Sequence, residues 1–366
     1  MFKNIYKGKK VLITGHTGFK GTWLTTWLLD LGAEVFGISK DIPTHPSMFE
    51  TLSLEGKIHH YTENLLNLDF VVSKVKEIKP DFVFHLAAQA IVSESKRNPV
   101  ETFQTNVIGT TNVLEALRLS MHPCVAIIIT SDKCYDNVEW VWGYKETDAL
   151  GGKDIYSGSK GAAELVAKSY FHTFFKDSPV RIATVRAGNV IGGGDWALDR
   201  IVPDCIRAWS EKRKVTIRHP YATRPWQHVL EPISGYLTIG QSLYDSNTLQ
   251  GEGFNFGPDL DANYTVQDIL LSMAKLWGFS DPSTSYAVEE SKVKFNEAQL
   301  LKLNCDKALF HMKWRPTLNY NHLIEFVSDW YVKFYKEKAP MYDFTIKQIR
   351  HYEAIAKEKN IQWALN

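Results

Sequence analysis

The chain has 366 residues, of which 44% are hydrophobic and 23% are charged, and its formal net charge is +1. These values are ordinary for a globular protein with a large core, and they give no electrostatic reason to expect a nucleic acid or an anionic membrane as a partner. The four cysteines form no C-x-x-C pair and no apolar window approaches the roughly 20 residues that cross a bilayer, so we predict no disulfide framework, no metal site and no membrane span.

The first half of the chain alternates short apolar runs with amphipathic stretches. Strands are predicted at 10–15, 34–39, 81–88 and 125–130, with further strands at 180–188 and, more weakly, at 253–258. Helices are predicted at 20–32, 70–80 and 100–120. Repeated alternation of this kind requires crossover connections and predicts an α/β fold with a Rossmann-type, doubly wound parallel sheet.

A glycine-rich turn follows the first strand, where "VLITGHTGFKGTWL" contains Gly15, Gly18 and Gly21 between a strand and a helix. The first glycine permits the tight turn, the second lets the backbone approach a phosphate, and the third lets helix and strand pack closely. Because the helix N-terminus adds free N–H groups and a positive dipole end, we predict that this turn binds the pyrophosphate of a dinucleotide. A packing turn without a ligand is the alternative. The expected cofactor contacts include the residues between the glycines: His16, Thr17, Phe19 and Lys20.

The position that should carry an acidic residue for the adenosine ribose of NAD is Ser39, at the end of the second strand. Farther along, "TENLLN" provides Asn64, whose amide can bond an adenine amine, and Leu65 beside it. NAD is therefore the predicted cofactor. The missing carboxylate, together with His16 and Lys40, leaves NADP open.

Tyr156 and Lys160 in "DIYSGSKGAAELV" stand four residues apart, so they lie on one face of a helix. A lysine ammonium one turn away and a nicotinamide cation nearby favour the phenolate and make Tyr156 a usable base. A second polar cluster, Ser131, Asp132 and Lys133 of "IIITSDKCYD", closes a buried strand. For these three residues a solvated turn is the alternative.

The glycine turn and the Tyr-x-x-x-Lys pair together resemble the extended short-chain dehydrogenase/reductases. Within that family the chain is similar to the nucleotide-sugar 4,6-dehydratases. The similar segments are "TSDKCYDN", "EWVWGYKE", "VRAGNVIGGGDWALDRIVPD" and "RPWQHVLEPISGY". The lysine in Ser-Asp-Lys resembles the type that acts on CDP-glucose, whereas the dTDP-glucose type has glutamate there. The resemblance covers nearly the whole chain, and the last fifth most loosely.

This resemblance implies an NAD-dependent hydro-lyase that converts CDP-D-glucose into CDP-4-dehydro-6-deoxy-D-glucose. It implies that Ser131 bonds the reacting hydroxyl and that Tyr156 takes the C4 hydroxyl proton while a hydride leaves C4. The resulting ketone acidifies the C5 proton, which neutral Lys133 is expected to remove. Asp132 is expected to protonate the departing C6 hydroxyl before the hydride returns to C6. Which of Asp132 and Lys133 is acid and which is base stays open at this stage.

Five residues of the second half are predicted to contact the substrate. Arg200 and Arg224 are expected donors for the diphosphate, because the planar guanidinium suits that group. The resemblance implies the Arg224 contact and adds Asn189 as support for the sugar phosphate. Trp196 and Trp226 are candidates for stacking on the base or covering the sugar, with core packing as the alternative. For Arg200 a surface salt bridge is the alternative.

Two further groups are expected around the site. Trp140 and Trp142, shortly after Lys133, are expected to form a wall of the pocket. The remaining expected cofactor contacts come from "HLAAQ" and the helix after it: Ala87, Ala88, Gln89 and Asn106.

The alternation weakens after about residue 187, where the loops become rich in Gly, Pro, Trp and Arg. We therefore predict an NAD-binding domain at 1–187, to which about 226–246 returns, and a smaller, mixed α/β nucleotide-sugar lobe at 188–335. Residues 336–366 are predicted to form a helical, charged tail on the surface.

Small and apolar residues occur on more than one face of the helices predicted around 101–119 and 156–175. A helix buried on two sides fits a homodimer or a dimer of dimers, with core packing as the rival interpretation. The N-terminus has no apolar signal segment, so a cytoplasmic location is expected.

Three other functions stay open. A 4,6-dehydratase acting on a GDP-, dTDP- or UDP-sugar is possible because the nucleotide base follows from the resemblance alone. A nucleotide-sugar 4-epimerase or simple reductase would need Ser131, Tyr156 and Lys160 but would have no use for Asp132 and Lys133. A regulatory dinucleotide-binding protein without catalysis is the third, and the intact Ser, Tyr and Lys argue against it.

Overall fold

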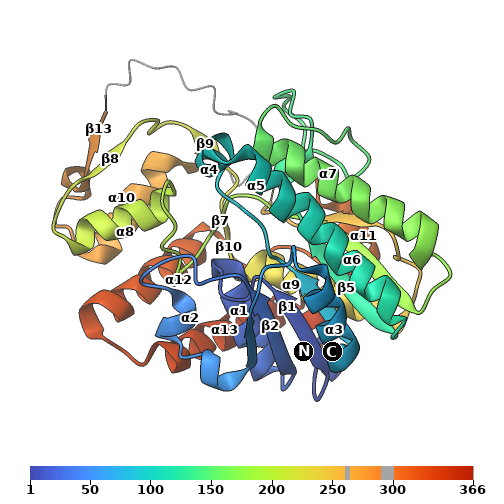
Figure 1. Ribbon diagram of the computed structural model, residues 1–366. Helices are drawn as coiled ribbons and strands as arrows, with labels where there is room; N and C mark the ends of the chain where they lie inside the picture. Colours follow the sequence, from blue (N-terminus) through green and yellow to red (C-terminus); the bar gives the residue numbers. More distant parts are fainter. Residues whose placement is uncertain (260–263, 290–300, 366) are drawn as a thin grey trace.

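In the computed structural model, which describes residues 1–259, 264–289 and 301–365, the centre of the protein is a seven-stranded parallel sheet (Figure 1). Its strand order is β11-β6-β5-β4-β1-β2-β3. The strands are β1 (Lys10–Thr14), β2 (Glu34–Ser39), β3 (His59–Thr62), β4 (Phe82–His85), β5 (Cys124–Ile129), β6 (Val180–Arg186) and β11 (Gly253–Asn255). The predicted α/β fold with a doubly wound parallel sheet is confirmed.

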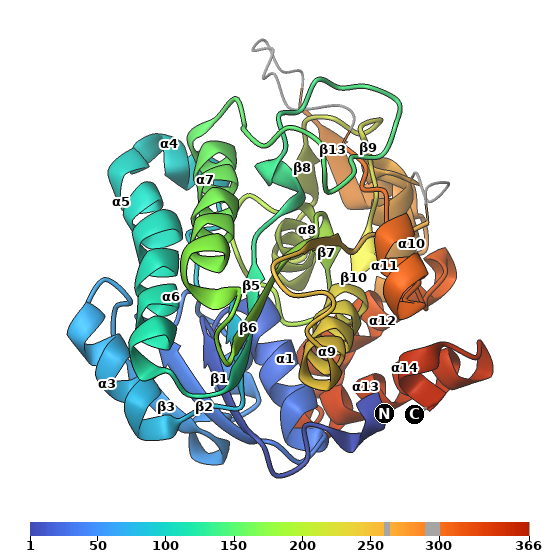
Figure 2. The ribbon, with the colours of Figure 1, turned by 90° about the vertical axis from the view of Figure 1, so that its right-hand side faces the viewer.

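The central strands are buried on both faces because helices cover the sheet from both sides (Figure 2). In β1, for example, Val11 and Ile13 join one core cluster while Leu12 joins the other. This arrangement explains why these strands are continuous apolar runs rather than alternating ones. One face is covered by α3 (Leu68–Ile78), α6 (Gly109–Ser120) and α7 (Ile155–Tyr170), and the other by α1 (Phe19–Asp30) and α9 (Leu230–Asp245).

The chain reverses its direction of winding between β1 and β4, which lie side by side in the sheet. Loops that leave the carboxyl ends of such neighbouring strands form the crevice in which open α/β sheets bind ligands. The glycine turn follows β1 and residues 86–91 follow β4, so the fold brings two predicted cofactor segments together at this point.

Strand β3 was not predicted from the sequence. Its four residues, "HHYT", are only partly buried, and the strand lies at the edge of the sheet. Because it has no apolar run, the hydrophobic pattern gave no signal for it. The strand predicted at 125–130 is therefore the fifth, β5, rather than the fourth.

The helix predicted at 100–120 is interrupted. Helix α5 (Pro99–Phe103) passes through a π-helical turn, η3 (Gln104–Ile108), into α6. Asn106 lies in this turn, and its side chain bonds both backbone groups of Gln89 at 2.8 and 3.0 Å. Such turns are found frequently at functional sites, and this one faces the loop after β4.

A smaller group of helices and short strands lies beyond the carboxyl ends of the sheet (Figure 1). Its members are α8 (Ile201–Ser210), α10 (Val266–Trp277), β8 (Val215–Ile217), β9 (Thr223–Arg224), β12 (Tyr264–Thr265) and β13 (Tyr286–Val288). The pairs are β8 with β13, which is parallel, and β9 with β12, which is antiparallel. Segments β7 (Val190–Ile191) and β10 (Gln227–His228) form a third pair, between this group and the sheet.

The C-terminal segment is helical, but the prediction of a surface tail is wrong. Helix α13 (Met341–Glu358) packs on α1, where Trp27 donates a hydrogen bond of 2.9 Å to Glu353. Tyr352 and Trp363 are fully buried, and Trp363 stacks on Phe2 with ring centroids 5.0 Å apart. Apart from Glu353, the charged residues of this helix are exposed, and its inner face belongs to the main core.

The remaining short elements connect these layers. They are η1 (Phe2–Asn4), α2 (Met48–Thr51), η2 (Glu55–Lys57), α4 (Val92–Arg97), η4 (Asp132–Cys134), η5 (Phe171–Phe175), η6 (Pro282–Ser285), α11 (Asp306–Met312), α12 (Tyr320–Val332), η7 (Lys333–Glu337) and α14 (Gln362–Leu365). Within the described ranges, no helix is both long enough and apolar enough to cross a membrane.

Candidate active site

The glycine turn has the close packing that its three glycines were predicted to allow. Gly15 follows β1 with φ +76°, and a Cβ there would lie 2.7 Å from the backbone of Ala87 in the loop after β4. A Cβ on Gly21 would lie 2.1 Å from the Gly15 carbonyl oxygen. Only glycine fits at either position, because the neighbouring atoms belong to the backbone and cannot rotate away.

The N-terminus of α1 is open to a ligand. Gly18 is its N-cap residue, so no side chain caps the first turn, and the N–H groups there remain available. Thr17, just before, is held by a hydrogen bond of 2.7 Å from its hydroxyl to the Asp41 carbonyl oxygen. A helix of 12 residues beginning at a glycine cradle suits a pyrophosphate.

His16 and Ser39 both point into the protein. The His16 ring is fully buried and forms hydrogen bonds with Ser39 Oγ at 2.9 Å and with His60 Nδ1 at 2.7 Å. Burial, followed by the nearby His60, lowers the pKa of His16 to about 3, so the ring is neutral at physiological pH. The ammonium of Lys40 is paired with Glu101 at 2.9 Å.

The other predicted cofactor residues line the loops around this turn. Asn64 is exposed and accepts a hydrogen bond from Leu66 N at 3.0 Å, whereas Leu65 is buried. Gln89 and Ala88 lie in the loop after β4. The amide of Asn106, besides holding Gln89, donates to Ser159 Oγ at 2.8 Å, which in turn donates to the Tyr156 carbonyl oxygen.

The polar cluster after β5 is buried rather than solvated. Ser131 Oγ donates to Asp132 Oδ1 at 2.9 Å and accepts from Lys133 N at 3.3 Å. Asp132 is 3% exposed, and a Cβ on Gly188 would lie 1.8 Å from its Oδ2. The absence of a side chain at Gly188 thus makes the space that the carboxylate occupies. Lys133 is partly exposed.

Tyr156 stands in the first turn of α7, which Asp154 caps by accepting a hydrogen bond from Ser157 N at 3.0 Å. Burial raises the pKa of the phenol to about 12, the charge of Asp132 adds to this, and a hydrogen bond from Ser131 and the charge of Arg200 oppose it. The protein by itself therefore keeps the phenol neutral, and the expected ionisation needs a further positive charge at the site.

Lys160 follows one turn later and is also buried. Burial lowers the pKa of its ammonium to about 8, whereas its electrostatic interactions with Cys134 and Glu164 raise that pKa. The group is mainly charged at pH 7 and loses that charge in mildly alkaline solution. Both members of the Tyr-x-x-x-Lys pair are thus inside the protein, and α7 packs against η4, the turn directly after β5.

Two cations from other segments join this cluster. Lys20 of the glycine turn interacts electrostatically with Arg200, Asp132 and Lys160, and burial lowers its pKa to about 8. Arg200 pairs with Asp195 at 2.9 Å, but the Asp195 side chain is buried, so this ion pair is not the plain surface salt bridge considered from the sequence. Its guanidinium nevertheless acts on Tyr156, because its positive charge lowers the pKa of that phenol.

The remaining substrate candidates lie in the second half of the chain. Asn189 has a left-handed backbone conformation, with φ +50°, directly after Gly188. Arg224 is partly exposed in β9, and its Nη1 donates to the Thr223 carbonyl oxygen at 2.8 Å. Trp196 is buried and bonds Tyr335 Oη at 2.9 Å, and Trp226 is buried and bonds the Tyr264 carbonyl oxygen at 3.1 Å. Both tryptophans are packed as core residues.

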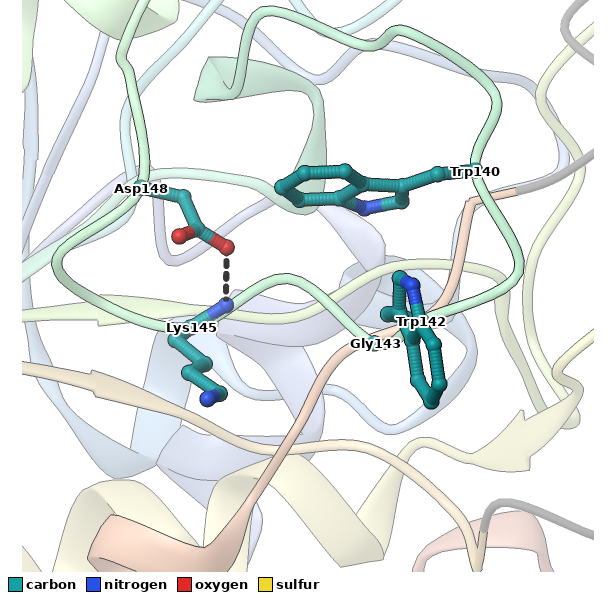
Figure 3. Close-up of a pocket in the computed structure, with 5 residues that line it drawn as sticks. All are labelled: Trp140, Trp142, Gly143, Lys145 and Asp148. Carbon is teal, nitrogen blue, oxygen red and sulfur yellow. Dashed lines mark hydrogen bonds between the residues drawn. The ribbon is translucent and has the colours of Figure 1, made fainter.

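Trp140 and Trp142 line a pocket in the loop between η4 and α7, together with Gly143, Lys145 and Asp148 (Figure 3). The backbone N–H of Lys145 donates to Asp148 Oδ2 at 2.7 Å across the pocket floor. The two indoles are 41% and 70% exposed, and none of the predicted catalytic residues lines this pocket, so their role as a wall of the active site stays a prediction.

Sequence reasoning missed three residues that shape the site: Gly188, Glu164 and Arg186. Glu164 and Arg186 form an ion pair of 2.9 Å in which both side chains are almost fully buried. A charged residue one turn after Lys160, among the small residues of α7, was the available signal. In the described part of the chain, no group of three or more His, Cys, Asp or Glu could hold a metal ion.

The fold and this cluster of Ser, Tyr and Lys at the carboxyl ends of the strands define a dinucleotide-binding enzyme of the short-chain dehydrogenase/reductase class. A family model described as GDP-mannose 4,6 dehydratase matches residues 12–327. The chain is 44% identical over 334 residues to a CDP-glucose 4,6-dehydratase of Salmonella typhimurium, covering 90% of this chain and 92% of the relative. The protein therefore belongs to the nucleotide-sugar 4,6-dehydratase family, and the predicted membership is confirmed.

Solved structures agree on the fold. A dTDP-glucose 4,6-dehydratase from Streptomyces venezuelae with NAD and TYD bound has a TM-score of 0.75 at 18% identity, covering 90% of this chain and all of that one. A UDP-glucose 4-epimerase from Thermotoga maritima with UDP-glucose has a TM-score of 0.76 at 19% identity, covering 89% of this chain and 99% of that one. Dehydratases and epimerases share this fold, so the choice between them depends on the site.

Proposed function

We propose that the protein catalyses the 4,6-dehydration of a nucleotide-activated hexose, with CDP-D-glucose as the substrate. One observation separates this reaction from simpler hydride transfer. Asp132 and Lys133 directly follow Ser131, and Asp132 is buried within electrostatic reach of Tyr156. An epimerase or reductase has no use for this pair, whereas loss of water needs both an acid and a base.

NAD is the proposed cofactor, and when bound it supplies the acceptor and later the donor of the hydride. The open N-terminus of α1 and the glycine cradle fit its pyrophosphate. NAD is favoured over NADP because neither of the two side chains that left NADP open offers an available positive charge. His16 is neutral, and Lys40 is paired with Glu101. A 2′-phosphate would need a cation that is available to bind it.

Each catalytic residue has a proposed task. Tyr156 removes the C4 hydroxyl proton while Ser131 holds that hydroxyl, and Lys160 and Arg200 supply positive charge that favours the phenolate. Lys133, in its neutral form, removes the C5 proton next to the new ketone. Asp132, in its protonated form, gives a proton to the departing C6 hydroxyl. After the hydride has returned to C6, Lys133 gives its proton back to C5, so substrate and product differ by one water, without net oxidation.

Residues of the second half are proposed to bind the nucleotide sugar. Arg224 and Arg200 offer guanidinium groups to the diphosphate, and Asn189 supports the sugar phosphate. In this proposal, residues 1–187 with 226–246 hold the cofactor, and most of 188–335 holds the substrate. Trp196 and Trp226 are proposed to pack in the core rather than to stack on the base, since both indoles are buried among other side chains.

The substrate proposal is tested by incubating the protein with CDP-, dTDP-, GDP- and UDP-glucose and following the 4-keto-6-deoxy product by its near-ultraviolet absorbance in alkali. We expect CDP-glucose to be turned over fastest, in keeping with the named function of the 44% identical relative. Inversion at C4 without loss of water would establish an epimerase instead. No turnover of any of the four would favour a regulatory protein.

The acid–base proposal is tested with Lys133→Met. We expect this variant to lose dehydration yet to retain exchange of the C4 hydride, because Tyr156, Lys160 and the cofactor cradle are unchanged. The readouts are product formation and loss of isotope from C4-labelled substrate. Lys153→Met, which alters an exposed lysine in the same connection, is the matched control and should resemble the wild type. Normal dehydration by Lys133→Met would contradict the role given to this lysine.

We also propose that the protein forms a homodimer through α5, α6 and α7, which lie side by side (Figure 1). Large apolar side chains are exposed on this surface: Val100, Phe103, Ile108, Leu119, Leu165 and Phe174. Burial of such a surface against a second copy would remove apolar area from water.

A cytoplasmic location is proposed as well, and cell fractionation tests it. A role in supplying deoxyhexoses for surface polysaccharides is also proposed, and analysis of the polysaccharide after gene deletion tests that role.

A further inference from the structure

Glu164 has an unusual environment for a carboxylate on a helix. It lies one turn after Lys160 and two turns after Tyr156 on α7, and it is 3% exposed. Arg186 at the end of β6 binds it with two parallel contacts, Nε to Oε1 at 3.0 Å and Nη2 to Oε2 at 2.9 Å. Such bidentate pairs fix direction as well as distance.

The same carboxylate is also bonded to the ends of two strands. Thr184 of β6 donates to Oε2 at 2.7 Å, and Thr130, the residue before Ser131, donates to Oε1. Arg186 extends the network, since its Nη1 donates at 2.7 Å to Tyr135 Oη, two residues after Lys133. Thr130, bonded to Glu164, and Tyr135, bonded to Arg186, therefore lie on either side of the segment that carries the proposed acid and base.

A buried charge with four donors cannot shift without leaving some of them unpaired, and each loss would be costly in a low-dielectric interior. Glu164 thus connects α7 to the residue that follows β5 and to two residues of β6. Tyr156 and Lys160 belong to the same helix as Glu164. The hydrogen bonds of Glu164 therefore also influence the position of these two side chains relative to Ser131 and Asp132.

We propose that Glu164, paired with Arg186, is a positioning residue. It holds Tyr156 and Lys160 at the distance from Ser131, Asp132 and Lys133 that the reaction requires. This inference rests on the proposed dehydratase function. Glu164 acts through these residues and does not contact the substrate. Its charge has a second consequence, because it raises the pKa of Lys160 against the effect of burial. The rival explanation is that the pair only stabilises the fold.

The test compares Glu164→Gln with the wild type by steady-state kinetics and by titration of selectively 13C-labelled lysine, using Lys160→Met to assign the Lys160 signal. We expect kcat to fall by about 10- to 100-fold with KM nearly unchanged, because misplacement of catalytic groups affects the chemical step more than binding. We also expect Lys160 to titrate at a lower pH than in the wild type. Glu77→Gln, which breaks the exposed Lys74–Glu77 pair on α3, is the control and should change neither value.

A second variant covers the case in which Glu164→Gln does not fold. The double variant Glu164→Gln with Arg186→Met removes both charges, a change that buried ion pairs often tolerate. A folded double variant with reduced kcat and unchanged KM would support the proposal. Wild-type kcat in either folded variant, or failure of both variants to fold, would assign the pair to stability alone and overturn it. If the wild type turns over no nucleotide sugar, the proposed function fails, while the lysine titration still tests the influence of Glu164 on Lys160.

Discussion

At the scale of single residues, the site depends on how Asp132 is accommodated. A carboxylate that is 3% exposed needs both hydrogen-bond donors and space. Ser131 provides the donor at 2.9 Å, and Gly188 provides the space because it has no side chain. The acid proposed for dehydration therefore depends on a glycine about 56 residues away in sequence, which no local pattern around Asp132 reveals.

Gly188→Ala tests this dependence. A Cβ would lie 1.8 Å from Asp132 Oδ2, so we expect the carboxylate to be displaced and kcat for dehydration to fall by about 10- to 100-fold. The free energy of unfolding should fall by only about 1–3 kcal/mol, as is usual for overpacking by one methyl group. Steady-state assays and denaturant unfolding measure the two effects. Gly257→Ala, where the nearest atoms would be 3.5 Å away, is the control. A folded Gly188→Ala with wild-type kcat would show that Asp132 does not act from this position.

At the scale of elements, a second buried carboxylate connects three segments far apart in sequence. Glu231 of α9 accepts hydrogen bonds from Thr317 N and Leu318 N and from Tyr352 Oη of α13. The C-terminal helix, predicted from its charge to lie on the surface, is anchored to the core at this point. The prediction failed because charge on one face of a helix says nothing about what covers the other face.

This contact predicts a pH-dependent stability. Burial raises the pKa of Glu231 from its ordinary 4.5 to about 7, so the folded protein holds this proton more tightly than the unfolded chain. The contribution to stability is complete below pH 4.5 and is lost as the pH rises through about 7. Glu231→Gln cannot ionise, so between pH 5 and pH 8 the wild type should lose stability relative to this variant, on the order of 3 kcal/mol.

Thermal unfolding of both proteins at several pH values measures this difference. Glu325→Gln, which changes an exposed glutamate on the neighbouring helix α12, should follow the wild type at every pH. If the difference between wild type and Glu231→Gln stays constant across this range, the Glu231 carboxyl does not titrate there, and the physical account given for it is wrong.

At the scale of the whole molecule, the helical face formed by α5, α6 and α7 is both the support of the active site and the proposed dimer surface. Tyr156 and Lys160 of α7 are buried, while Leu165 on the same helix is exposed. A helix that is apolar on two sides packs one side against the core. Its other side exposes apolar surface to water, and such a surface is typical of an interface with another protein.

The dimer is tested with Leu165→Glu. We expect the wild type to have twice the chain mass in sedimentation or light scattering, and the variant to have the mass of one chain at the same concentration, because a buried unpaired carboxylate is costly at an interface. Leu276→Glu introduces the same charge at an exposed leucine of α10, away from this face, and should remain dimeric. A monomeric wild type, or a variant of unchanged mass, would contradict the proposal.

The strands and helices of the sheet were predictable from the hydrophobic pattern. Buried parallel strands have continuous apolar runs, and the helices that connect them have apolar residues at a period of 3.6. Strand β2 was predicted to the residue, and the strand–helix alternation predicted the fold class. The polar edge strand β3 was not predicted, since it produces no hydrophobic pattern of its own.

The sequence by itself determined which chemical groups are available: a glycine cradle, a Tyr–Lys pair and an adjacent Asp and Lys. The residues of each group are close together in the sequence, so their spacing is sufficient to indicate their chemistry. Only the tertiary structure decided that Asp132 is buried beside Gly188, that Lys20 and Arg200 join the cluster, and that Glu164 pairs with Arg186 beneath it. The physical reason is that burial and charge depend on atoms brought together from distant segments, and these set the pKa values and geometry that chemistry requires.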